Sequence, residues 1–207
     1  ELLEQACAEA FARGQEQGTA HAALQWQQRM DDYIAGQGQE AAQRLDALVN
    51  NASSFHPTPM GTATAQDWDA LFASNARAPF FLAQAAAPHL KASRGAIVNL
   101  VDIYAERPLA QHPLYCMAKA ALLMATRSLA LELAPDVRVN AVAPGAILWP
   151  EQDEMDSNKQ AALLSRTPLA RTGSVEEIAE TVRWLLRDAT YVTGQVIRVD
   201  GGRMLAG

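Results

Sequence analysis

GAIVNLVD, at residues 95–102, is a short apolar run that ends in an aspartate. Apolar residues on both faces are typical of a strand buried in a parallel sheet, because helices cover both sides of such a sheet. Three further stretches have the same form and end in polar residues or glycine: LDALVNNA (45–52), VRVNAVAPG (137–145) and QVIRVDGG (195–202). The sequence therefore predicts four buried parallel strands.

Helical patterns separate these strands, at residues 65–91, 111–134 and 174–188. Ser174, followed by Glu177 three residues later, has the pattern of a capping box, and Thr64 precedes its helix in a similar way. Alternation of strands and helices is typical of βαβ units. We therefore expect an α/β fold, a Rossmann-like three-layer arrangement around a parallel sheet.

Residues 1–44 differ from the rest of the chain. The first 45 residues contain nine glutamines, many alanines and few residues that favour strands. We expect a helical N-terminal segment of unclear role at 1–44, and at 45–207 the catalytic half of a Rossmann-like domain that is truncated at its N-terminal half. GQEQG at 14–18 has neither the preceding strand nor the spacing of a glycine-rich phosphate-binding turn. The edge of the strand at 45–52 is then open unless those helices or another chain cover it.

The composition limits the classes of partner. The chain has 207 residues, 49% of them hydrophobic, and a net charge of −6, which argues against binding to nucleic acid or to an acidic membrane surface. Cys7 and Cys116 have no metal-like spacing, so neither a metal site nor a disulfide framework is indicated. We expect a cytoplasmic protein with a small-molecule substrate and no membrane span.

Tyr115 and Lys119 are four residues apart at the start of a predicted helix, so their side chains share one face. A lysine ammonium near a phenol is expected to lower the pKa of the tyrosine, as suits a general acid. The alternative is an exposed tyrosine with an unrelated lysine. Asp102 ends a strand 13 residues before Tyr115, at the sheet edge where α/β proteins bind ligands.

These motifs, in this order, resemble the short-chain dehydrogenase/reductase family over residues 45–207. The resemblance is carried by NNA at 50–52, Asn75 in SNARAPFF, YCMAK at 115–119, RVNAVAPG at 138–145 and TGQVIRVDGG at 193–202. It implies that Tyr115 donates a proton, that Lys119 binds the nicotinamide ribose and tunes the tyrosine, and that Asn75 holds a proton-relaying water. The residues that it places at the cofactor are Asn51, Ala52, Ser53, Tyr115, Lys119, Pro144, Gly145 and Ile147.

Two departures from the family pattern point to a subfamily. The family usually has serine at the position of Asp102 and glycine at the position of Ser53. With NNASSFHPTP at 50–59, these departures resemble the pteridine reductases, which reduce pterins and folates with NADPH. An acid paired with a tyrosine can protonate a ring nitrogen, and Phe55 is expected to stack a pterin against the nicotinamide. The alternatives are that Asp102 caps a helix or loop and that Phe55 packs in the core.

Residues 146–167 resemble the mobile substrate loop of the family, in which Leu148 and Trp149 are candidate pocket walls. The candidate substrate-binding residues are Phe55, Ser53, Asp102, Tyr115, Leu148 and Trp149. The four histidines show no ligand spacing and are assigned to the surface or to packing: His21, His56, His89 and His112.

The resemblance implies NADPH-dependent reduction of a pterin or folate C=N bond. Two alternatives stay open: a short-chain reductase of another carbonyl or imine substrate, and a catalytically impaired fragment that only oligomerises. Family members commonly assemble through the helices that correspond to 65–91 and 111–134, which implies a homo-oligomer, either a dimer or a tetramer.

Overall fold

The computed structural model describes residues 44–147 and 157–206. Within them, four parallel strands form one sheet in chain order. The strands are β1 (Ala47–Asn50), β2 (Ala96–Leu100), β3 (Arg138–Pro144) and β4 (Val196–Val199). Each lies inside the apolar run that predicted it.

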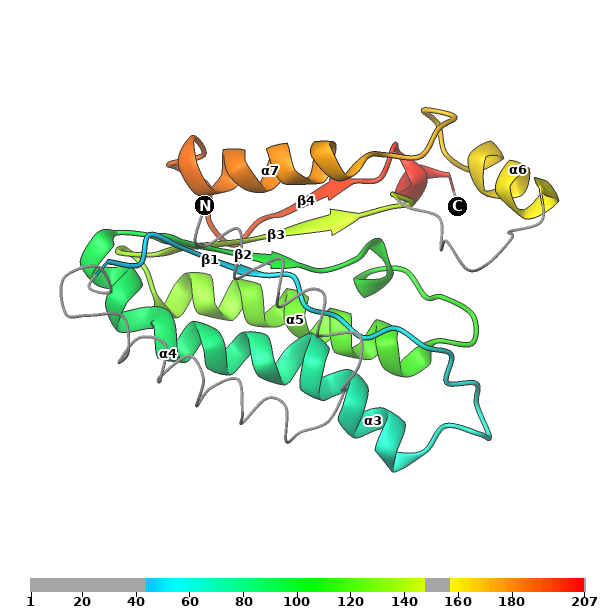
Figure 1. Ribbon diagram of the computed structural model, residues 1–207, viewed down its shortest axis with the longest axis horizontal. Coiled ribbons are helices and arrows are strands. Elements are labelled where there is room, and N and C mark those ends of the chain that lie inside the picture. The colour runs from blue at the N-terminus through cyan, green and yellow to red at the C-terminus, as the bar shows by residue number, and fades with distance from the viewer. Residues whose placement is uncertain (1–43, 148–156, 207) are drawn as a thin grey trace.

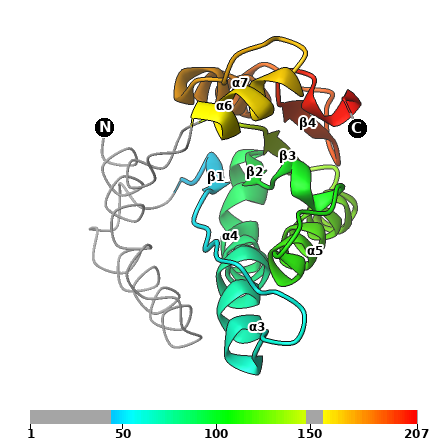
Figure 2. The same cartoon turned by 90° about the vertical axis from the view of Figure 1, so that its right-hand side faces the viewer.

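Helices cover both faces of this sheet, as Figures 1 and 2 show. One face carries α3 (Ala65–Phe72), the π-helical turn η1 (Ala73–Arg77), α4 (Ala78–Ser93) and α5 (Pro113–Glu132). The other face carries α7 (Val175–Arg187). Short 3-10 turns, η2 (Ile103–Ala105) and η3 (Arg203–Leu205), follow β2 and β4. The three-layer α/β fold that the sequence predicted is confirmed.

The core lies between β2, β3 and the helices on either side. Every residue of β2 is buried, which agrees with its continuous apolar sequence. Leu122 and Leu123 of α5 pack against β3 on one face, and Leu185 of α7 packs against Val98 and Val142 on the other. By length and composition α5 is apolar enough to cross a membrane, but half of its most apolar window is buried inside the protein. We therefore interpret α5 as a core helix.

A buried chain of hydrogen bonds runs from β1 through β2 to α5. Asn50 Nδ2 donates to Asn99 Oδ1 at 2.7 Å, and Asn99 Nδ2 donates to Thr126 Oγ1 at 2.9 Å. The Thr126 hydroxyl in turn donates to the Leu122 carbonyl at 2.9 Å. All three polar side chains are at most 6% exposed, and each is satisfied. This chain fixes the carboxyl end of β1 relative to the helix that carries Tyr115.

Some sequence-based expectations differ from the structure or lie outside it. The region 146–167, expected as a mobile loop, contains α6 (Ser157–Ser165), whose sequence SNKQAALLS has too few apolar residues to indicate a helix. Residues 1–43, which carry the predicted N-terminal helices, lie outside the described residues, as do Leu148 and Trp149.

Candidate active site

Asp102 and Tyr115 meet at the carboxyl end of β2. The Tyr115 hydroxyl donates a hydrogen bond to Asp102 Oδ2 at 2.7 Å. The other carboxylate oxygen, Oδ1, accepts from the backbone N–H of Tyr104 at 2.9 Å, so Asp102 also caps η2. The capping role that was an alternative for Asp102 therefore exists beside the contact with Tyr115. The cap orients the carboxylate so that its second oxygen faces the phenol.

Lys119 lies one helical turn beyond Tyr115 and is almost fully buried. Its side chain is 2% exposed, and Nζ donates to the carbonyl oxygen of Leu100 at 2.9 Å. Nζ lies 5.8 Å from the centroid of the Tyr115 ring. The alternative of an exposed tyrosine with an unrelated lysine therefore does not hold.

Burial dominates the electrostatics of this group. Burial raises the pKa of the Asp102 carboxyl above its ordinary value of 3.8, although its hydrogen bonds oppose this. Burial lowers the pKa of Lys119 to about 8, against the opposing attraction of Asp102. The pKa of Tyr115 is raised, first by burial and then by the Asp102 charge. The expectation that Lys119 lowers the pKa of Tyr115 is wrong for this structure, because burial and a carboxylate outweigh an ammonium that lies beside the ring.

Asn75 lies in the π-helical turn η1 and is fully buried. Its Oδ1 accepts from the Ser53 hydroxyl at 2.6 Å, and its Nδ2 donates to the carbonyls of Ser54 and Leu71 at 2.9 and 3.0 Å. Turns of this type are common at functional sites, where they re-aim one side chain. Here Asn75 anchors the loop that follows β1, and both of its amide protons are engaged by protein carbonyls.

Residues 51–64, which follow β1, form the post-β1 loop. Asn51, Ala52 and Ser53 lie at its start and are exposed, as a ligand-binding role requires. The Ser53 hydroxyl is held by Asn75, so its position relative to η1 is fixed.

Phe55, from the same loop, contacts residues at the start of α5. Its ring stacks on His112 with centroids 4.6 Å apart, and it meets the Tyr115 ring edge-on at 4.8 Å. Phe55 is 58% exposed, so the core-packing alternative does not hold. His112 was assigned to the surface or to packing, yet it lies within this cluster. Its position three residues before Tyr115, at the start of a helix, was the only signal in the sequence.

Pro144 is the last residue of β3, and Gly145 and Ile147 follow it. Gly145 N donates to the Val199 carbonyl at 3.0 Å, and a Cβ at Gly145 would lie 2.7 Å from Cα of Asp200. This glycine therefore lets β3 and β4 approach closely. Ile147 is half-buried, and it packs against Gly173 so closely that a Cβ there would lie 2.7 Å from Ile147 Cδ1.

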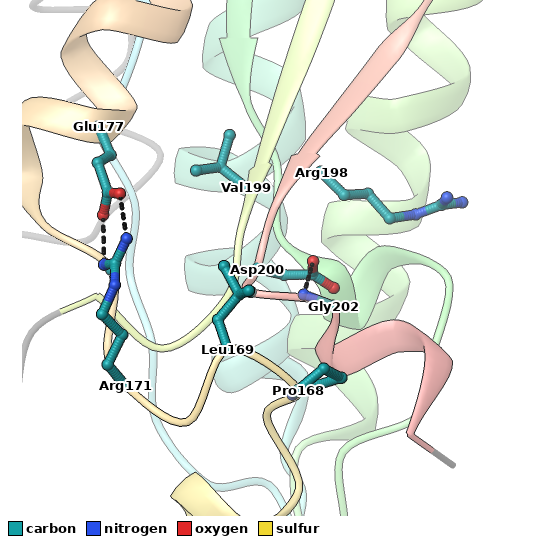
Figure 3. Close-up of a pocket in the computed structure, with 10 residues that line it drawn as sticks. Pro168, Leu169, Arg171, Glu177, Arg198, Val199, Asp200 and Gly202 are labelled. Atoms are coloured by element: carbon teal, nitrogen blue, oxygen red, sulfur yellow. Dashed lines mark hydrogen bonds and ion pairs between the residues drawn. The ribbon is translucent and has the colours of Figure 1, made fainter.

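A hollow of about 390 Å³ lies at the end of β4, between that strand and the segment that leads into α7. Figure 3 shows residues that line it, among them Arg171, which makes a bidentate ion pair with Glu177. The distances are 2.9 Å from Nη1 to Oε2 and 2.6 Å from Nη2 to Oε1. None of the candidate site residues within 44–147 and 157–206 lines this hollow. The Asp102–Tyr115 pair, where two groups that can donate a proton lie together, is therefore the candidate active site.

In open α/β sheets ligands bind outside the carboxyl ends of the strands, which is where Asp102, Tyr115 and Lys119 lie together. The family model described as enoyl-(acyl carrier protein) reductase matches residues 3–203. The chain belongs to the short-chain dehydrogenase/reductase family. The match begins at residue 3, whereas the motifs support the resemblance only from residue 45.

Similar proteins differ in their named activities. The chain is 41% identical to pteridine reductase 1 of Leishmania tarentolae, over 78% of this chain and 64% of that protein. It is 36% identical to the 3-oxoacyl-(acyl-carrier-protein) reductase of Thermotoga maritima, over 78% and 67%. A solved structure described as a 2-deoxy-D-gluconate 3-dehydrogenase from Agrobacterium tumefaciens, with bound NADP, is 34% identical with a TM-score of 0.73, over 78% and 68%. The chain thus spans about two thirds of the length of these proteins.

Proposed function

We propose that this chain carries the catalytic site of an NADPH-dependent reductase that acts on the C=N bond of a pterin or folate. The observation that carries the proposal is the 2.7 Å hydrogen bond between Tyr115 and Asp102 beside the exposed ring of Phe55. The 41% identity to a pteridine reductase supports the same substrate class.

Reduction of a C=N bond requires a hydride at carbon and a proton at nitrogen, as the π bond breaks. When NADPH is bound, it supplies the hydride. The proton comes from the Asp102–Tyr115 pair. Because burial raises the pKa of Asp102, this carboxyl group holds a proton closer to neutral pH than an exposed aspartate does. A protonated Asp102 donates to the Tyr115 oxygen, which frees the phenol hydrogen to point at the substrate nitrogen.

Lys119 and the residues at the carboxyl ends of β1 and β3 are our candidates for binding the nicotinamide end of the cofactor. A lysine ammonium has three N–H donors, and within the described residues the carbonyl of Leu100 accepts one of them. The remaining donors suit ribose hydroxyls. The other residues that we assign to cofactor binding are Asn51, Ala52, Ser53, Pro144, Gly145 and Ile147. A glycine-rich turn for the pyrophosphate is not present among residues 44–147 and 157–206.

Phe55 is the candidate wall for a flat heterocycle. His112 covers one face of the Phe55 ring, so a heterocycle would stack on the opposite face. Aromatic rings favour offset or stacked contacts at 4.5–7 Å, and a pterin has the shape and the polarisable surface for such a contact. We assign Ser53, Asp102 and Tyr115 to hydrogen bonds with the heterocycle, and retain Leu148 and Trp149 as further pocket residues.

A second candidate function is the reduction of another carbonyl or imine. The family model and the Thermotoga maritima relative, at 36% identity, favour it. A carbonyl oxygen becomes an alkoxide that one phenol can protonate, so such a reaction does not need the second acid. The third candidate is a catalytically impaired fragment that only oligomerises, and a chain that binds no NADPH would support it.

We also propose that the protein self-associates through α4 and α5 and resides in the reducing cytoplasm, where Cys116 stays a free thiol. On α5 three large apolar side chains recur every seven residues and are 46–79% exposed: Met117, Met124 and Leu131. This spacing places them in one stripe. Phe80 and Phe81 of α4 are also exposed, at 40% and 42%. Analytical ultracentrifugation of a Met124→Lys variant would test this, since a charge in the stripe should yield monomers.

The test of function is NADPH oxidation at 340 nm with a dihydropterin, a folate and a 3-oxoacyl ester as substrates. Turnover with the pterin or the folate alone supports the proposal. Turnover with the ester alone supports the second candidate. Calorimetric titration with NADPH separates both from the third candidate, because a chain that binds no NADPH cannot be an ordinary reductase. An Asp102→Ser variant sharpens the result, since a carbonyl reductase should tolerate this change and a pterin reductase should lose most of its rate.

A further inference from the structure

Helix α5 carries Tyr115 and Lys119, yet it begins without a side-chain cap of its own. His112 is the N-cap residue, and its side chain makes no hydrogen bond to the first turn. Its Nδ1 instead lies 2.8 Å from the carbonyl oxygen of Ala110. The first N–H groups of a helix have no partner within the helix, so their acceptors must come from elsewhere.

One acceptor comes from the post-β1 loop, 56 residues earlier in the chain. The Thr58 hydroxyl oxygen accepts a hydrogen bond from Leu114 N at 3.4 Å. The backbone N–H of Thr58 donates to the carbonyl of Gln111 at 2.7 Å. Gln111 has a φ of 65°, a left-handed conformation that is uncommon for glutamine. Thr58 is only 1% exposed, so bulk water does not compete for these groups.

The same loop brings Phe55 to the first turn of α5. Three residues before Thr58, the Phe55 ring contacts both His112 and Tyr115. The loop and the helix are therefore joined by two hydrogen bonds at Thr58 and by two ring contacts at Phe55. The hydrogen bonds restrict how far the loop can move relative to the helix, and so restrict the separation between the Phe55 ring and the Tyr115 hydroxyl.

We propose that Thr58 is a positioning residue that clamps the post-β1 loop to the start of the catalytic helix. It holds the Phe55 ring and the Tyr115 hydroxyl at a separation that lets a bound heterocycle contact both of them. The roles of Phe55 and Tyr115 in this statement rest on the proposed function. Thr58 itself contacts the backbone of α5 and takes no part in the chemistry.

Three variants test the clamp. Thr58→Val keeps the shape of the side chain but removes the acceptor, and Thr58→Ser keeps the hydroxyl. Thr58→Ala also removes the acceptor, and it replaces the valine variant if that variant does not fold. The matched control is Ser174→Ala, which removes a helix cap of the same kind at α7, remote from Tyr115.

Two readouts need no turnover. Loss of the acceptor should speed hydrogen exchange of the Leu114 amide about tenfold in Thr58→Val, with near wild-type exchange in Thr58→Ser and Ser174→Ala. The ring-current shift that Phe55 imposes on the His112 ring protons should shrink in Thr58→Val and Thr58→Ala but not in Thr58→Ser or Ser174→Ala. Unchanged exchange and an unchanged shift in Thr58→Val overturn the clamp, whether or not the protein is active.

Kinetics test the positioning role. Thr58→Val should lower kcat/KM for the dihydropterin about tenfold, mainly by raising KM, because a displaced Phe55 stacks poorly. Thr58→Ser should stay within about twofold of wild type, and Ser174→Ala should leave both constants unchanged. Normal kinetics in a Thr58→Val variant with a fast Leu114 amide overturn the positioning role. A wild-type chain that turns over no pterin refutes the proposed function, while exchange and ring shifts still decide the clamp.

Discussion

The N-termini of α5 and α7 solve the same physical problem in different ways. At α7, Ser174 Oγ accepts from Glu177 N at 3.2 Å and the Glu177 carboxylate accepts from Ser174 N at 2.8 Å, so the cap is complete within four residues. At α5, the acceptor for Leu114 N comes from Thr58, across 56 residues. A local cap stabilises one helix, whereas a cap from a distant loop also fixes two parts of a site relative to each other. Changes at α5 should therefore affect catalysis, and changes at α7 should affect stability alone.

Removing the proton donor at the start of α5 should have the largest effect. Tyr115→Phe keeps the ring and its contact with Phe55 but loses the hydroxyl, so kcat should fall by about 10²–10⁴. Single-turnover measurement of NADPH oxidation would report this, with circular dichroism to show an intact fold. A loss of less than tenfold would mean that Asp102 protonates the substrate without the phenol.

Replacing the acid should come next. Asp102→Asn has one side-chain oxygen in place of two, so if that oxygen keeps the cap on Tyr104 N, an amide NH₂ faces the Tyr115 hydroxyl. The amide cannot hold a transferable proton, so kcat should fall by about 10². In the wild type, kcat should decline as pH rises through the raised pKa of Asp102, which lies above 3.8. In the variant this decline should be absent. A pH–rate profile that is the same in both proteins would remove Asp102 from the proton pathway.

Asp102→Asn should lower activity but raise stability. The folded-state pKa of Asp102 lies above its unfolded value, so its contribution is full below the unfolded pKa and is lost as pH rises through the folded pKa. At neutral pH the native protein therefore carries the cost of a buried carboxylate. Asp102→Asn should therefore raise the free energy of unfolding at pH 7, measured by urea denaturation. Equal stability of the two proteins at pH 7 would show that Asp102 is already solvated or neutral there.

The stacking pair should have a smaller effect, on binding. Phe55→Ala should raise KM for a pterin about tenfold with a modest change in kcat, since stacking contributes to holding the ring. His112→Ala should raise KM less, because His112 supports Phe55 from behind. Steady-state kinetics would compare them. A larger effect for His112→Ala would mean that this histidine, and not Phe55, contacts the substrate.

The smallest effect on function should occur at α7. Ser174→Ala removes the local cap and should cost about 1 kcal/mol of stability with no change in kcat. The ion pair with Arg171 and the cap lower the pKa of Glu177 to about 2. This contribution is present above pH 4.5 and is lost as pH falls towards 2, so the thermal midpoints of the wild type and of Glu177→Gln should converge in acid. A lower kcat in Ser174→Ala would show that α7 communicates with the site.

The same contrast explains what the sequence could predict. The four strands, the capping box at Ser174 and the Tyr115–Lys119 turn depend on residues close together in the chain, and each was located from sequence. Asp102 was chosen by its position at a strand end. The partnership of Thr58 with Leu114 and the stack of His112 on Phe55 depend on how the post-β1 loop folds, and no local pattern encodes it. The predicted lowering of the Tyr115 pKa was wrong because the burial that raises this pKa depends on the whole fold.

The buried hydrogen bonds between β1, β2 and α5 have a consequence for the fidelity of folding. Asn50 and Asn99 are partners in the strand register, and their amides bond only in that register. A slip of β1 by one residue would turn the Asn50 side chain to the other face of the sheet and leave the Asn99 carbonyl without its donor in an apolar interior. A chain with β1 out of register therefore lacks the Asn50–Asn99 hydrogen bond. This favours the native register, so the start of the post-β1 loop takes the same position each time the protein folds.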